Sequence, residues 1–168
     1  MFEQIIADIQ RFTKDEKNLP TKAAVLLVHP GFHAVFLYRL SHWFFCHHLR
    51  VLAVFVAYWS SVLTGAQLSP RAVIGKGFLI CHPTGVVVGP ALIGDHCTLT
   101  QANLIGQRRG GGDRPSIGHH FYAGAGSKII GRIRIGNNVR VGANAVVLDS
   151  IPDGATAFGV PAKVVLKD

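Results

Sequence analysis

An aliphatic residue recurs at a six-residue interval along the second half of the chain. The positions are Leu68, Ile74, Ile80, Val86, Ile93, Leu99, Ile105, Ile117, Ala123, Ile129, Ile135, Val141 and Val147. A helix needs a period near 3.6 and a simple strand a period of two, so this pattern predicts short strands joined by tight corners. Glycine follows at seven of the thirteen positions, which is typical of backbone that turns or is closely approached. The pattern predicts a mainly β fold, a parallel β-helix of hexapeptide repeats whose aliphatic row fills the interior.

The repeat is interrupted in three places. A seven-residue step separates Val86 from Ile93. Residues 107–116 read Gln-Arg-Arg-Gly-Gly-Gly-Asp-Arg-Pro-Ser, and we interpret them as a basic loop extruded from the β-helix, the kind of segment that often carries function. After Val147 the pattern fails at Asp153, and residues 151–154 are predicted to form the turn that ends the β-helix before a C-terminal cap.

Residues 1–66 are predicted to form an N-terminal helical region, separate from the β-helix domain of residues 67–168. Apolar residues have helical spacing in residues 1–17, 32–43 and 49 to about 63, with Pro20 and Pro30 as breaks. Residues 51–68 carry no charge, a length at the lower edge of a membrane span. We interpret this stretch as a helix buried against partner subunits, and peripheral contact with a membrane stays open.

The composition limits the kinds of binding partner and the cellular compartment that we expect. The net charge is +8, and no Asp or Glu occurs between Glu16 and Asp95. The Lys and Arg residues of this segment without acids have two interpretations. They are ordinary solvated side chains, or they attract an anionic lipid or a phosphorylated substrate. A nucleic-acid partner is not expected, because the bases are not clustered with stacking aromatic residues. Three cysteines without metal-site spacing and no apolar signal core favour a cytoplasmic protein, with the inner face of the membrane as the alternative.

Several segments resemble bacterial serine acetyltransferases. They are residues 29–34 (His-Pro-Gly-Phe-His-Ala), 38–43 (Tyr-Arg-Leu-Ser-His-Trp), 82–89 (His-Pro-Thr-Gly-Val-Val-Val-Gly), 111–114 (Gly-Gly-Asp-Arg) and 159–163 (Gly-Val-Pro-Ala-Lys). The resemblance covers the chain from about residue 20 onward. It implies a left-handed β-helix, a homotrimer with active sites between neighbouring subunits, acetyl-coenzyme A (acetyl-CoA) as co-substrate, a small-molecule acceptor and no metal.

The resemblance implies that His82 is the general base of an O-acetyl transfer. A neutral imidazole can take the proton of an acceptor hydroxyl, and such a base contributes roughly 10²–10⁴ in rate. The family has an acidic partner fifteen residues earlier, where this chain has Gln67. An amide oxygen can orient an imidazole, but it lacks the charge that stabilises an imidazolium.

The acceptor-binding positions depart from the family pattern. Cys81 replaces the Asp that contacts the ammonium group of serine, and no acid occurs near Pro20, where the family has another Asp. Arg114, which would clamp a carboxylate, is retained, but its usual His neighbour is Pro115. A buried ammonium without an anion is costly, so a sugar hydroxyl is an equal alternative acceptor.

The resemblance also implies a coenzyme A site. Ala125 and Ala143 match the positions whose small side chains and backbone amides seat the pantetheine arm. Arg140 and Lys163 are candidate partners for its phosphates.

Three function classes therefore stay open. The first is an acetyl-CoA-dependent O-acetyltransferase. Its acceptor is either L-serine, as in cysteine synthesis, or a sugar hydroxyl, which would make it a polysaccharide or sugar O-acetyltransferase. The second is a zinc enzyme on the same scaffold, for which His82 and either His119 or His120 supply two ligands. The third is an inactive trimeric scaffold. A complex with cysteine synthase is not expected, because that docking mode uses a C-terminal isoleucine and this chain ends Leu166-Lys167-Asp168.

Overall fold

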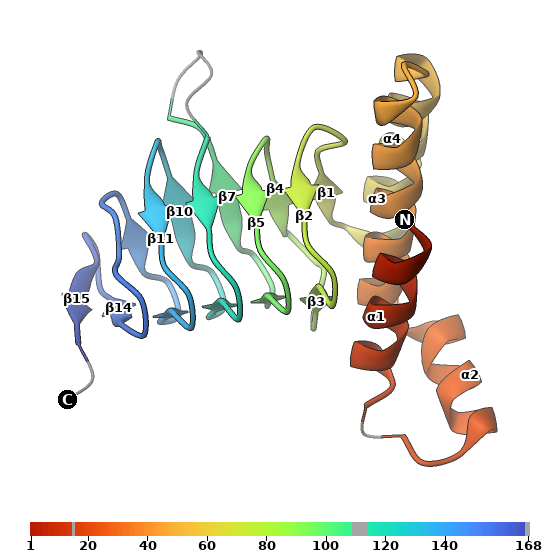
Figure 1. Cartoon of the computed structure of the whole chain (residues 1–168), viewed down its shortest axis with the longest axis horizontal. Coiled ribbons are helices and arrows are strands. Elements are labelled where there is room, and N and C mark those ends of the chain that lie inside the picture. The colour runs from red at the N-terminus through yellow and green to blue at the C-terminus, as the bar shows by residue number, and fades with distance from the viewer. Residues whose placement is uncertain (15, 109–113, 167–168) are drawn as a thin grey trace.

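In the part of the chain that the structure describes, four helices lead into a three-sided β-helix (Figure 1). The computed structural model describes residues 1–14, 16–108 and 114–166. The helices are α1 (Phe2–Phe12), α2 (Leu19–Val28), α3 (Pro30–Cys46) and α4 (Arg50–Thr64). Pro30 fits the first turn of α3, where its missing N–H is not needed. Helix α4 ends at Gly65, whose φ of 73° suits glycine, and the first strand begins at Gln67.

The strands of the described residues form three sheets, one for each face of the prism. Face A contains β1 (Gln67–Leu68), β4 (Val87–Val88), β7 (Leu104–Gly106), β10 (Lys128–Ile130) and β13 (Val146–Val147). Face B contains β2 (Val73–Ile74), β5 (Leu92–Ile93), β8 (Ser116–Ile117) and β11 (Arg134–Ile135). Face C contains β3 (Leu79–Ile80), β6 (Thr98–Leu99), β9 (Tyr122–Ala123), β12 (Arg140–Val141), β14 (Thr156–Phe158) and β15 (Lys163–Val165). The chain visits faces A, B and C in turn, and we name the corners the A–B, B–C and C–A edges.

Two rows of buried residues fill the prism. The first is the aliphatic row that the hexapeptide period predicts. The second row was not predicted. It lies two positions before the first and includes Ala72, Phe78, Val86, Ala91, Cys97, Phe121, Ile133, Val139 and Ala145.

Val86 belongs to the second row, so its predicted place in the first row is wrong. Val88 pairs with Leu68 and with Ile105 and is therefore the true first-row residue. The predicted seven-residue step is replaced by a step of eight, from Ile80 to Val88, and a step of five to Ile93. The extra residues lengthen the C–A corner that contains His82.

The β-helix extends beyond its predicted end. Ile151 bridges to Ile135 in parallel fashion and is buried, and β14 continues face C beside β12. The prediction failed because the first row resumes at Ile151 after a step of four instead of six. Strand β15 then folds back antiparallel on β14 and covers the exposed strand edge.

The predicted loop of residues 107–116 lies between β7 and β8. Residues 109–113 are outside the described residues. Ser116 is not in the loop, because it is part of β8 and pairs with Leu92 and Arg134.

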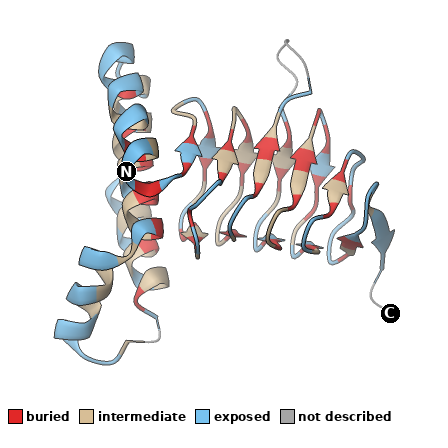
Figure 2. Ribbon diagram, turned by 180° about the vertical axis from the view of Figure 1, so that it is seen from behind, coloured by how far each residue is buried: buried red, intermediate tan, exposed pale blue. Residues whose placement is uncertain are grey.

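The helices stack against the N-terminal end of the prism, and their outer sides are largely exposed (Figures 1 and 2). Within the described ranges, no single helix has the length and apolar character needed to cross a membrane. Helices α2 and α3 meet that test only as a pair bent by 73°.

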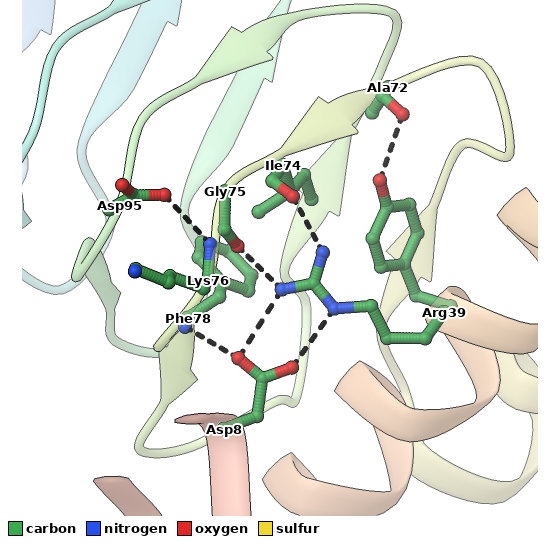
Figure 3. A network of polar contacts seen from close by, with 9 residues as sticks. Asp8, Arg39, Ala72, Ile74, Gly75, Lys76, Phe78 and Asp95 are labelled. Carbon is green, nitrogen blue, oxygen red and sulfur yellow. Dashed lines mark hydrogen bonds and ion pairs between the residues drawn. The ribbon is translucent and has the colours of Figure 1, made fainter. Parts of the chain in front are cut away.

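A buried ion pair joins α1 and α3 to the first coil (Figure 3). Arg39 donates to Asp8 at 2.9 and 3.3 Å and to the carbonyl oxygens of Ile74 and Gly75 at 2.6 Å each. Asp8 also accepts from the Phe78 amide at 2.9 Å. Burial raises the pKa of Asp8, and the bonds from Arg39 and Phe78 oppose that shift. Such charge-assisted bonds fix the two helices on the corner between β2 and β3.

Candidate active site

His82 lies in the lengthened C–A corner between β3 and β4. Backbone bonds hold both sides of this corner: the Cys81 amide donates to Leu99 O at 3.0 Å, and the Gly85 amide donates to Gly65 O at 3.0 Å. Pro83 is buried beneath the corner, whereas the His82 side chain is exposed. The corner therefore presents an imidazole to the outside of the prism from a fixed backbone.

Gln67 lies at the start of face A, on the other side of the same edge. Its amide donates to Val86 O at 2.8 Å, and it pairs with Val87 in the neighbouring coil. Within the part of the chain that the structure describes, the side chain of Gln67 has no hydrogen-bond partner. Gln67 and His82 therefore lie on the same C–A edge, but no hydrogen bond links their side chains in the described residues.

His29 lies close enough to His82 for their charges to interact, and its segment, residues 29–34, carries the family resemblance without predicting a role for it. The His29 Nδ1 atom accepts from the Gly31 amide at 3.1 Å, which caps the start of α3. In neutral His29 the proton is therefore on Nε2. Burial lowers the pKa of His29, and the nearby His82 lowers it further.

Gly31 sets how closely α3 approaches this corner. A Cβ atom at Gly31 would collide with the Ile80 carbonyl oxygen and would lie 3.0 Å from the His29 ring. The His29 ring therefore packs next to the peptide that leads into Cys81 and His82. Only glycine allows this contact.

Arg11, at the end of α1, also reaches the site. Its Nη2 atom donates to Thr98 Oγ1 at 2.9 Å, and Thr98 pairs with Leu79 on face C. Burial raises the pKa of the Cys81 thiol, and the positive charge of Arg11 counteracts that rise. No local sequence signal marks Arg11 or His29, because their contacts join positions that are about 50 to 90 residues apart.

Ala125 and Ala143 lie on the C–A edge, two and three coils beyond His82. They stack in consecutive coils, since the Asn144 amide donates to Ala125 O at 2.7 Å. A Cβ atom at Gly124 would lie 2.7 Å from the Ala143 amide, so the corners can stack this closely only with glycine there. The structure thus places both alanines in one column on the edge that contains His82.

Buried polar residues stiffen this edge from inside. Asn103 is fully buried, and its Nδ2 atom donates to Gly124 O at 2.7 Å and to Ser127 Oγ at 2.9 Å. Neither residue follows from the hydrophobic pattern, because both interrupt an otherwise apolar row. Lys128 adds a cation, donating to Ala102 O at 2.8 Å and to Gly126 O at 2.9 Å.

Arg140 and Lys163 are exposed on face C, in β12 and β15. Strand β14 lies between them, because Arg140 pairs with Thr156 and Lys163 pairs with Phe158. Both lie toward the C-terminal end of the prism, on the same side as Ala143.

Arg114 is exposed just before β8, on the A–B edge. His82 is on the C–A edge, so one chain does not bring the two residues together.

The histidines of the zinc alternative also lie apart. His119 and His120 form a B–C corner, where the Nδ1 atom of His119 accepts from the Asp95 amide at 3.0 Å. No group of three metal-ligating side chains occurs among residues 1–14, 16–108 and 114–166.

The chain is similar to serine acetyltransferases over nearly its whole length. Residues 114–149 match the family model for bacterial transferase hexapeptide (six repeats). The serine acetyltransferase of Synechococcus elongatus is 35% identical over 99% of this chain and 70% of its own length. That of Helicobacter pylori strain J99 is 37% identical over 95% of both chains.

Solved structures agree with the sequence comparison. The soybean serine acetyltransferase complexed with serine has a TM-score of 0.90 and 34% identity over 97% of this chain and 68% of its own. A serine acetyltransferase in complex with CoA has a TM-score of 0.87 and the same identity and coverage.

Proposed function

The chain belongs to the serine acetyltransferase family, and from this we propose that it transfers the acetyl group of acetyl-CoA to the hydroxyl group of L-serine. One observation carries the proposal: the similarity to serine acetyltransferases extends over nearly the whole chain. The soybean relative solved with serine bound supports serine as the acceptor. The left-handed parallel β-helix with an N-terminal helical segment is the fold of these relatives.

We propose that His82 is the general base. It would take the proton of the acceptor hydroxyl, so that the oxygen can bond to the thioester carbonyl carbon. When the carbon–sulfur bond then breaks, the imidazolium of His82 would return that proton to the leaving sulfur. Its exposed position in a backbone-fixed corner supports this role.

Gln67 is the proposed orienting partner. It lies across the same edge, and a modest rotation of either side chain changes their separation because neither is packed in the core. A neutral amide would leave the imidazolium without a counter-charge.

The C–A edge fits coenzyme A as the acetyl donor. Small side chains at Ala125 and Ala143 leave space along the edge, and Arg140 and Lys163 offer positive charge for phosphates near its far end. A relative solved in complex with CoA supports this assignment.

We also propose that the active form is a homotrimer. His82 and Arg114 lie on different edges of one prism, so an acceptor can meet both only where two subunits adjoin. Helix α4 also has a stripe of exposed apolar residues, Val51, Val54, Phe55, Tyr58 and Val62, which a partner subunit would cover.

The test is thiol release from acetyl-CoA by the full chain, with L-serine and a panel of sugars as acceptors. We expect turnover with serine, and we expect His82→Ala to lower kcat by about 10²–10⁴. His48→Asn, which changes an exposed histidine away from the site and suits the φ of 62° there, is the control and should retain wild-type activity. Absence of turnover with serine would reject the proposal.

A sugar hydroxyl is the second candidate acceptor. Gln67 and Cys81 are neutral where an ammonium group would need an anion, and a sugar needs only hydrogen bonds. Turnover with a sugar but not with serine would establish this candidate.

A further inference from the structure

A cavity of about 520 Å³ lies where the helices meet the A–B edge of the first coil. Helix α3 contributes Phe45, α4 contributes Arg50 and Val54, and the corner between β1 and β2 contributes residues 69–71. This volume is within the range of about 300–1,000 Å³ that small-molecule sites have. His82 lies on the C–A edge, so the cavity is separate from the candidate active site.

Hydrogen bonds hold the walls of this cavity together. The Nδ1 atom of His42 lies 2.8 Å from Pro70 O, which can only accept, and this bond joins α3 to the A–B corner. The Ser41 hydroxyl donates to Ala53 O at 2.7 Å and joins α3 to α4. The walls are therefore in place before a ligand binds, which lowers the cost of ordering them on binding.

Two guanidinium groups border this cavity without a counter-ion. Arg50 begins α4 and Arg71 lies in the A–B corner, and both side chains are exposed, so a ligand can reach them from solvent. Among the described residues, neither side chain forms an ion pair or donates a hydrogen bond. None of the described residues that line the cavity is acidic. An anion would therefore be attracted by two cations and repelled by no charge of the walls.

The lining favours a phosphate group over a carboxylate. A guanidinium can donate two parallel hydrogen bonds to the oxygens of either group. A phosphate monoester has three such oxygens and nearly two negative charges at neutral pH, so it matches two arginines, whereas one carboxylate leaves a cation unpaired. Phe45, Val54 and Pro70 are apolar and would contact the organic part of the ligand.

We infer that this cavity binds a phosphate monoester, whose phosphate group is held by Arg50 and Arg71. The site is independent of the proposed acetyl transfer, because the cavity shares no residue with the edge proposed for coenzyme A. The sequence left open whether the bases of the segment without acids attract a phosphorylated compound, and two of them would do so here. Val54 also belongs to the apolar stripe of α4, so the site lies at the border of the surface that the proposed trimer would cover.

Calorimetry of the full chain with phenyl phosphate tests the site. We expect phenyl phosphate to bind more tightly than inorganic phosphate, which lacks the apolar part, and than benzyl alcohol, which lacks the charge. Arg50→Met and Arg71→Met should each weaken the binding of phenyl phosphate about tenfold or more, the range for a hydrogen bond to a charged group.

Further variants serve as controls. Arg140→Met removes an exposed arginine of the proposed donor edge and should leave the affinity for phenyl phosphate unchanged. Arg71→Lys keeps the positive charge and should retain more of the binding than Arg71→Met does. Circular dichroism and thermal unfolding check that the methionine variants fold, since methionine keeps the apolar stem of the side chain.

The outcomes decide whether the cavity is the site. Absence of phenyl phosphate binding by the wild type, or equal affinity of the wild type, Arg50→Met and Arg71→Met, would overturn the inference. Loss of binding in Arg140→Met alone would also overturn it, because the phosphate would then lie on the proposed donor edge.

Sedimentation with phosphatidylcholine vesicles, with and without phosphatidic acid, identifies the source of the phosphate group. If phosphatidic acid vesicles sediment the wild type but not Arg71→Met, the cavity binds a lipid headgroup. If the wild type binds phenyl phosphate and does not sediment with these vesicles, the cavity binds a soluble phosphate monoester. Both results support the site.

Discussion

At the scale of single residues, His29 has two tasks that depend on its protonation. Its Nδ1 atom caps α3 only while that nitrogen is unprotonated, and its ring lies against the corner that contains His82. A lowered pKa means that folded His29 binds a proton less tightly than unfolded His29 does. His29 therefore contributes stability that is complete above its ordinary pKa of about 6.5 and is lost as the pH falls below it.

His29→Asn is expected to reduce the acid sensitivity of folding. Asparagine is a good N-cap residue and does not titrate, so the variant should lose less stability than the wild type between about pH 7 and pH 5. Thermal unfolding across that range measures the difference. His48→Asn, at an exposed position with a φ of 62° that asparagine tolerates, should behave like the wild type. Parallel pH profiles for wild type and His29→Asn would contradict the assignment.

At the scale of elements, the hexapeptide period predicted the strands and the inward row, because each coil repeats the same strand and corner geometry. It failed where a corner has a different length, at Val86 and at Ile151, since periodicity cannot detect a lengthened or shortened corner. The motif around His82 predicted the candidate base. The approach of Arg11 and His29 could not be predicted, because it depends on how α1 and α3 dock on the first coil.

The docking of α1 and α3 depends on the Asp8–Arg39 pair. Asp8→Ala leaves a buried guanidinium without its anion and should lower the free energy of unfolding by about 3–5 kcal/mol, as measured by urea denaturation. Glu3→Ala, an exposed acid on the same helix, should have little effect.

The double variant Asp8→Ala/Arg39→Met tests whether the effect belongs to the pair. Its loss in free energy of unfolding should be smaller than the sum of the losses in the two single variants, because removing both charges leaves neither one unpaired. Simple additivity would mean that the two residues act independently.

At the scale of the whole molecule, the apolar stripe on α4 indicates how copies of the chain assemble. All five side chains of the stripe are more than half exposed in the single chain, and α4 has no charged residue after Arg50. An exposed apolar surface of this kind usually marks an interaction site. The separation of Arg114 from His82 on the prism is consistent with a site completed by a second copy.

Phe55→Glu should therefore dissociate the proposed trimer, because it places a charge in the centre of the stripe. Analytical ultracentrifugation of the wild type and the variant at the same concentration measures the change. Phe55→Leu, which keeps the position apolar, should remain trimeric. A trimeric Phe55→Glu variant would contradict the interface, and sedimentation with anionic vesicles would then show whether the stripe contacts lipid.

The stacked corners of the C–A edge lie at regular intervals along the prism. Coils in a parallel sheet are spaced by about 4.8 Å, so Ala125 and Ala143 lie roughly 10 and 14 Å along the edge from the corner of His82. Each further coil lengthens the edge by the same increment without changing the chemistry at its start. Inserting or deleting one whole coil beyond β10 would therefore change the length of the edge that is the proposed donor site, while the corner with the proposed base His82 stays as it is.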